Sequence, residues 1–218
     1  MKKSIWILCL AIAITGILSF ENSAIAVLNV SGNVAQDSNT GFEWLVMSQT
    51  VNKSPDRIMA GDYGLKGAGW ALATISQINT LFLNAGIKEP FNGTSSPWNY
   101  DAINHLVALL EYTYEVNSEF GDNFGIQAFC AATGTSPGSL YTPNILVGST
   151  PTGNVGGANI SGASVPSSVA SPTIGNWLVR ANPAISPPAF GSNSATLTNN
   201  YVPLKVGDKL IKLMDIPF

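Results

Sequence analysis

Histidine and cysteine are scarce in this chain, which has one histidine and two cysteines among 218 residues. A single histidine, His105, excludes zinc and iron centres that are built from several histidine ligands. Cys9 lies in an amino-terminal segment that we expect to be removed, which leaves Cys130 alone. We therefore expect no internal disulfide in the mature chain, whose stability then has to come from packing.

Charge is also sparse, because Asp, Glu, Lys and Arg make up 11% of the residues and the formal net charge is −3. A slightly acidic chain lacks the basic surface that nucleic acids and anionic membranes require. Beyond the amino terminus, no apolar run approaches the roughly 20 residues of a membrane-spanning helix. We expect neither a nucleic-acid partner nor a membrane span in the mature chain.

Residues 1–26 have the pattern of a secretory signal peptide. Lys2 and Lys3 precede an apolar run over residues 5–18, and small residues follow at Ala24 and Ala26. Charged, apolar and small segments in this order are typical of export signals. We predict cleavage after Ala26 and a secreted protein, either extracellular or at the cell surface.

Local patterns in the mature chain predict small antiparallel strands and two to three helices. A β-hairpin is expected over residues 28–45, with its turn at 37–41. A short helix is expected after Ser54-Pro55 and should end at Gly61, and a second helix should begin at the capping box Thr74-x-x-Gln77 and end at Gly86. A third helix is expected from about residue 97 to about residue 115. This mixture indicates an α+β domain.

Residues 131–175 are dominated by Gly, Ser, Thr, Pro and Asn, which favours a long loop-rich excursion. Apolar islands at 140–141 and 145–147 leave short strands open as an alternative. A compact strand is expected at 176–180, and a terminal hairpin across Gly207-Asp208. We therefore divide the chain into a signal peptide, a domain over 27–180, and a Pro-rich segment with the hairpin over 181–218.

Four motifs resemble the extracellular domain of bacterial proteins that are sorted by a PEP-CTERM anchor. They are Asp37-x-x-Thr40-Gly41-Phe42-Glu43-Trp44-Leu45, Thr50-Val51-Asn52-x-Ser54-x-Asp56, Gly69-Trp70-Ala71-x-Ala73-Thr74 and Leu81-Phe82-x-Asn84-Ala85-Gly86. The resemblance extends to Trp177-Leu178-Val179-Arg180, where such domains usually end. The chain departs from the family at Ala71 and Gln77, where arginine and an acidic residue are common.

The family's anchor, a Pro-Glu-Pro motif with a hydrophobic helix and basic residues, does not follow Arg180. Release, or attachment through a partner, is therefore expected. The order of elements is similar to that of the C-type lectin-like fold, an analogy that does not fix function. The segments 89–92 and 98–101 match the calcium and sugar signatures of true lectins only loosely, so we expect no metal and no cofactor.

Two patterns could carry hydrolytic chemistry. Gly134-Thr135-Ser136-Pro137-Gly138 matches the Gly-x-Ser-x-Gly nucleophile motif, but Pro137 lacks the backbone N–H that the oxyanion hole uses. Cys130 could pair with His105 as nucleophile and base, although its neighbours favour a buried small side chain. We interpret the Ser136 segment as a turn and His105 as a surface residue, and predict no enzymatic activity.

Aromatic residues divide into core candidates and binding candidates. Trp44 and Trp70 are expected to pack on the helix face formed by Ile75, Ile78, Leu81 and Phe82. The candidate binding residues, as a sugar-stacking platform with one carboxylate, are Trp98, Tyr100, Asp101 and Tyr141.

Three functions remain open at this point. We favour a non-catalytic protein that acts by recognition or assembly, with an extracellular polysaccharide or a surface protein as partner. The alternatives are a self-associating structural component of the matrix and a secreted hydrolase that uses Cys130 or Ser136 with His105. Each function predicts a different feature. Recognition predicts an exposed aromatic patch, self-association predicts free edge strands, and a hydrolase predicts a pocket that joins His105 to a nucleophile.

Overall fold

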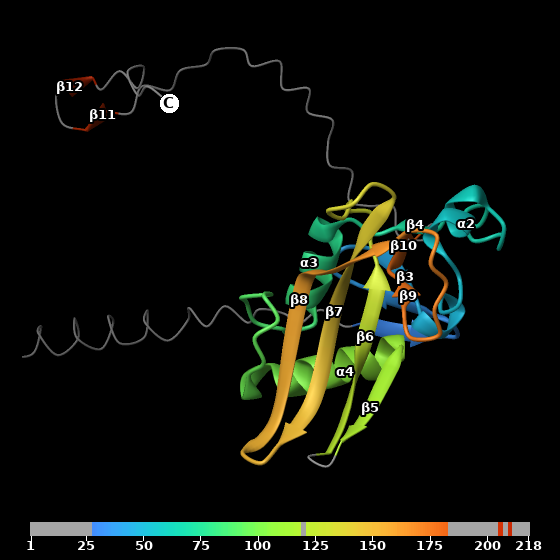
Figure 1. The fold of residues 1–218 in the computed structure, drawn as a ribbon. Coiled ribbons are helices and arrows are strands. Elements are labelled where there is room, and N and C mark those ends of the chain that lie inside the picture. The colour runs from blue at the N-terminus through green and yellow to red at the C-terminus, as the bar shows by residue number, and fades with distance from the viewer. Residues whose placement is uncertain (1–27, 119–120, 183–204, 207–208, 211–218) are drawn as a thin grey trace, which may run out of the picture. The chain divides into compact units, whose positions relative to one another are not determined.

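A computed structural model describes residues 28–118, 121–182, 205–206 and 209–210 (Figure 1). The chain divides into two units, Met1–Ile185 and Ser186–Phe218. In the second unit, β11 (Lys205–Val206) pairs antiparallel with β12 (Lys209–Leu210), as the expected terminal hairpin requires. The predicted signal peptide and most of residues 181–218 lie outside the described residues.

The first unit is mixed α+β, as expected. Its first sheet has the order β1 (Leu28–Ser31), β2 (Val34–Asp37), β3 (Phe42–Leu45), β10 (Leu178–Ala181) and β4 (Ala71–Leu72). The predicted turn at 37–41 is confirmed, because the Asp37 carboxylate accepts hydrogen bonds from the backbone N–H groups of Asn39 and Thr40. The hairpin has three strands rather than two, because Gly32, at φ +59°, makes a second turn between β1 and β2.

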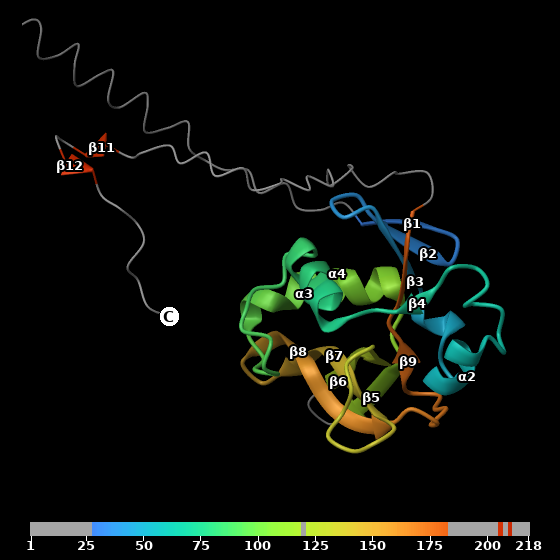
Figure 2. The ribbon, with the colours of Figure 1, turned by 90° about the horizontal axis from the view of Figure 1, so that it is seen from above.

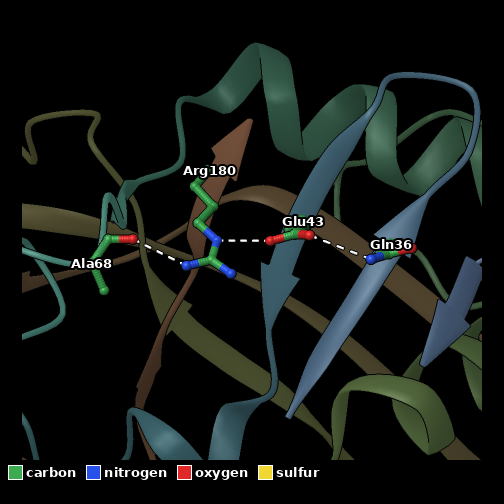
Figure 3. Close-up of polar contacts among 4 residues, drawn as sticks. All are labelled: Gln36, Glu43, Ala68 and Arg180. Atoms are coloured by element: carbon green, nitrogen blue, oxygen red, sulfur yellow. Dashed lines mark hydrogen bonds and ion pairs between the residues drawn. The ribbon is translucent and has the colours of Figure 1, made fainter. Parts of the chain in front are cut away.

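Pairing of β3 with β10 brings the amino-terminal strands of this domain together with its last strand. Arg180 lies directly opposite Glu43 in the register, and its Nε lies 2.7 Å from the Glu43 carboxylate (Figure 3). The other Glu43 oxygen accepts from Gln36, and Arg180 Nη1 donates to the Ala68 carbonyl. The guanidinium also lies 4.4 Å from the ring centre of Trp70. The Arg180 side chain therefore links its own strand β10 to β3 and to the segment over residues 68–70.

Two helices begin and end where the sequence predicts. The helix α2 (Pro55–Ala60) follows Ser54 and ends at Gly61, which has φ +99°. The helix α3 (Ile75–Asn84) opens with the predicted capping box: the Thr74 hydroxyl accepts from the Gln77 N–H, and the Gln77 side chain accepts from the Thr74 N–H. A 3-10 turn, η1 (Met47–Gln49), precedes them.

The third helix is shorter than predicted. A 3-10 turn, η2 (Pro97–Asn99), leads into α4 (Tyr100–Leu110), and the chain leaves the helix at Glu111 with φ +66°. The Thr113 N–H then donates to the carbonyl of Gly125, and its hydroxyl accepts from the Gln127 N–H, so Thr113 bonds to the strand over residues 121–129. Tyr114 begins β5 (Tyr114–Ser118) instead of continuing the helix. Tyr114 follows Leu110 by four residues, a spacing that fits a helix, but it lies in a strand.

The long loop-rich excursion expected over residues 131–175 is wrong, and the alternative of strands at 140–141 and 145–147 is confirmed, because both islands lie in one strand over residues 139–150. The second sheet is an antiparallel meander of β5, β6 (Gly121–Phe129), β7 (Ser139–Thr150) and β8 (Gly153–Pro166), with β9 (Gly175–Asn176) parallel to β6. Its strands β7 and β8 are the longest ones described. The expected strand at 176–180 is divided into β9 and β10, with Trp177 between them.

The core lies between the second sheet and the two long helices. Helices α3 and α4 lie over one face of that sheet (Figure 2). Trp44 is 1% exposed and joins the core cluster of Ile78, Leu81 and Phe82, as predicted. Trp70 is also buried, but the predicted contact is wrong: it packs in a second cluster with Leu45, Ile58 and Leu178. No helix among the described residues is both long and apolar enough to cross a membrane.

Candidate functional site

One described tryptophan is exposed while the others are buried. Trp98 has 66% of its surface exposed, whereas Trp44, Trp70 and Trp177 are at most 5% exposed. A large aromatic side chain contributes to stability mainly through burial, a contribution that a largely exposed indole does not make, and its exposed ring face is free to contact a ligand. Trp98 is therefore the first candidate for contact with a ligand.

The backbone around Trp98 is fixed on both sides. Ser96 forms a two-bond bridge with Gly156 of β8, with N···O distances of 2.9 Å in each direction. The side chain of Asn99 is 3% exposed and bonds to both the N–H and the carbonyl of Lys88. These anchors hold η2 against the sheet, so the Trp98 ring is presented from a rigid segment.

The structure brings together only part of the predicted binding set. Asp101 is exposed in the first turn of α4, three residues after the exposed Trp98 of η2. Tyr100 is half-buried and packs against the core. Tyr141 pairs with Ser164, whereas Val147 pairs with Gly156 beside η2. Six residues of strand correspond to roughly 20 Å, so Tyr141 lies away from Trp98.

The hydrolase candidates do not form a catalytic arrangement. His105 is exposed on α4, and Cys130 is fully buried in the core, where burial raises the pKa of its thiol. Within the described part of the chain, no hydrogen bond joins His105 to Cys130 or Ser136. Ser136 begins a tight turn in which the Ser139 N–H donates to its carbonyl and Gly138 has φ +71°. This turn is the structure that we predicted for the motif.

A pocket that sequence reasoning missed lies between α2, β4 and the 131–139 loop. Its volume is about 550 Å³, within the range of ligand sites in proteins. Asp56 is the one charged residue of its lining, and the hydroxyl groups come from Thr133, Thr135, Ser136, Ser139 and Ser167. No signal in the sequence placed Asp56 next to the Ser136 turn, because their proximity depends on the strand order.

No group of three or more His, Cys, Asp or Glu in the described ranges is arranged to hold a metal ion. No family model matches the chain, and no curated protein and no solved structure matches it either. Trp98 and the pocket are therefore the two candidate sites of the described structure.

Proposed function

We propose that this protein is a secreted, non-catalytic recognition module that binds an extracellular glycan through Trp98. The observation that carries the proposal is the 66% exposure of an indole on a segment that is anchored at Ser96 and Asn99. An aromatic face offers apolar contact to the C–H face of a sugar ring, and the anchored backbone means that the segment itself does not have to become ordered on binding. Asp101 supplies a carboxylate that accepts hydrogen bonds from sugar hydroxyls.

We further propose that the fold is C-type lectin-like. Three features support this proposal. The last strand of the domain, β10, pairs with β3 of the amino-terminal hairpin. The helices α3 and α4 follow the first strands, and a meander of β6, β7 and β8 belongs to a separate sheet. The fold alone does not imply a sugar ligand. The ligand assignment rests on Trp98.

The test is a glycan array probed with the exported protein, followed by titration of the best glycan against Trp98→Ala. Loss of a central aromatic contact costs about 2 kcal/mol, so we expect binding to weaken roughly thirtyfold. The melting temperature should not change, since the ring is exposed. Tyr112, which is 56% exposed on another segment, provides the matched control in Tyr112→Ala.

Two results would contradict the proposal. One is a glycan that binds Trp98→Ala as well as the parent. The other is the absence of any glycan signal together with concentration-dependent oligomers in sedimentation, which would favour a self-associating matrix component. The edge strand β1, with Val30 43% exposed, is the surface through which such pairing would then be sought.

A further inference from the structure

We propose that the pocket between α2, β4 and the 131–139 loop is a second binding site, which takes an extended peptide segment with a lysine or arginine side chain. The peptide pairs with the free edge of β4 and places its cation at Asp56. The site shares no residue with the Trp98 surface, so it does not depend on the proposed glycan binding. Three observations carry it: the edge, the pocket and the isolated carboxylate.

The free edge is defined by the strand order. β4 is the last strand of the first sheet, and its partner β10 lies on one side only. In the register, Leu72 faces Leu178, and the Ala73 N–H donates to the Trp177 carbonyl. This pattern makes Leu72 and Leu178 a non-hydrogen-bonded pair of an antiparallel ladder. Both the N–H and the carbonyl of Leu72 therefore point away from β10.

The open part of this edge is one residue long. Before it, the Trp70 N–H donates to the Leu65 carbonyl, and after it the Ala73 carbonyl accepts from Ala131. The N–H and carbonyl of Leu72 have no hydrogen-bond partner among the described residues. One residue of an added extended chain can exchange two hydrogen bonds with Leu72, as in other cases where a peptide extends a sheet.

The pocket lies where that added chain would run. Ala71 and Leu72 line it from β4, Met59 lines it from α2, and Leu140 from β7. Met59 is 41% exposed, so its side chain is accessible to a ligand in the pocket. These groups give apolar contacts to side chains on either side of the paired peptide residue.

The carboxylate of Asp56 determines the charge of the ligand. It is the one charged group of the lining, and it has no ion pair or hydrogen bond with any described side chain. The neighbouring cations are engaged elsewhere. Arg57 pairs with Asp62 at 2.7 Å and lies over the Tyr63 ring, and Lys53 lies over the same ring. An unneutralised carboxylate in a groove attracts a cationic side chain and disfavours an acidic one.

A peptide fits this site better than a sugar does. Leu72 presents one donor and one acceptor at strand spacing, which a main chain matches with its own carbonyl and N–H. The apolar walls suit side chains that alternate across an extended segment. The hydroxyls of Thr133, Thr135 and Ser136 at the rim can bond to the remaining peptide groups.

The experiment titrates the exported protein with the acetylated and amidated pentapeptide Val-Thr-Lys-Thr-Val by calorimetry. Nuclear magnetic resonance follows the Leu72 amide in parallel. We expect binding, a shift of the Leu72 signal, and weaker binding of the peptide with Glu in place of Lys. The variant Asp56→Asn should weaken the Lys peptide roughly two- to fivefold, the size of an exposed ion pair. Glu115→Gln, an exposed carboxylate on β5, is the matched control and should leave the affinity unchanged.

Backbone pairing is tested with two further peptides, N-methylated at the odd or at the even positions. Successive N–H groups of an extended chain point to opposite sides, so one version should bind and the other should lose roughly tenfold or more. Any one of four results would overturn the proposal. They are equal binding of the Lys and Glu peptides, equal binding of the two methylated forms, an unchanged Leu72 amide signal, and no binding at all. The glycan array decides the Trp98 proposal separately, because it uses a different ligand.

Discussion

Trp177 lies edge-on to Trp44 in the core, with ring centres 6.3 Å apart and ring planes at 88°. The two indoles are almost fully buried, but they differ in their N–H groups. Trp177 Nε1 donates to the carbonyl of Pro143 at 3.1 Å, whereas Trp44 Nε1 has no partner in the described structure. The pair therefore contains one indole whose polar group is satisfied and one whose polar group is not.

This difference predicts unequal costs for the same substitution. Trp177→Phe and Trp44→Phe remove the same atoms from one core, so their packing losses should be similar. Trp177→Phe also leaves the buried Pro143 carbonyl without its donor, which adds about 1–3 kcal/mol. Urea denaturation should show Trp177→Phe to be the less stable variant by that amount. Equal free energies of unfolding would show that the Pro143 hydrogen bond adds nothing.

The Arg180–Glu43 pair should matter more than the other described ion pair. Glu43 has 7% of its side chain exposed, and its loss leaves Arg180 without its main partner. We expect Glu43→Gln to lower the free energy of unfolding by about 1–3 kcal/mol. The control is Asp62→Asn, in which the broken pair with Arg57 is exposed and should leave the melting temperature unchanged. The interpretation fails if the two variants melt alike.

Cys130 should make stability depend on pH in mildly alkaline solution. Burial raises the pKa of its thiol in the folded chain, so the unfolded chain loses the proton first. Below about pH 8.5 both states carry the neutral thiol and there is no effect; above it the free energy of unfolding falls as pH rises. Burial also raises the pKa of Tyr114, which acts only at higher pH.

The measurement compares urea denaturation of the parent and of Cys130→Ala at about pH 7 and about pH 9.5. We expect the parent to lose more stability between the two conditions than the variant does. A parallel loss in both proteins would show that other groups cause the pH dependence.

The sequence predicted those elements whose signals are local. The capping box of α3 needs only Thr74 and Gln77, three residues apart, and the end of α2 needs only Gly61. The burial of Cys130 and Trp44 followed equally from side-chain type. Each of these features is specified by residues that are neighbours in the chain.

The sequence indicated only two short islands of β7 and nothing of β8, because the glycines of these strands are required by contacts with residues distant in sequence. A side chain at Gly148 would overlap Asn123 of β6, and one at Gly156 would meet the Asn99 carbonyl at 2.9 Å. The many glycines of β7 and β8 therefore permit close contacts across the sheet and with η2, although a Gly-rich composition on its own is typical of a loop. The same reason hid the pocket, since the free edge at Leu72 exists only once the strand order is known.

The pairing of β7 with β8 is irregular, because Thr142 faces Ala163 but Asn144 faces Asn159. Between them, Pro143 has no N–H to give to a ladder, so the partner strand bulges. Gly162 lies in that bulge with φ +62°, and its N–H donates to the Asn159 side chain. The bulge thus lets a proline, whose carbonyl binds Trp177, lie within a long strand.

Gly162→Ala should disrupt this arrangement for two reasons. A left-handed backbone costs about 1–2 kcal/mol for a residue with a Cβ. The added methyl group would also overlap the Thr142 carbonyl oxygen, which is backbone and cannot rotate away, and overpacking of this kind costs about 1–3 kcal/mol more. The matched control is Gly32→Ala, since Gly32 has φ +59° and nothing within 4 Å of the added atom. Urea denaturation should therefore show the larger loss for Gly162→Ala, and Trp177 fluorescence should shift in that variant alone. If the two alanine variants are equally stable, the contact with Thr142 is not limiting, and the bulge tolerates a side chain by moving β8.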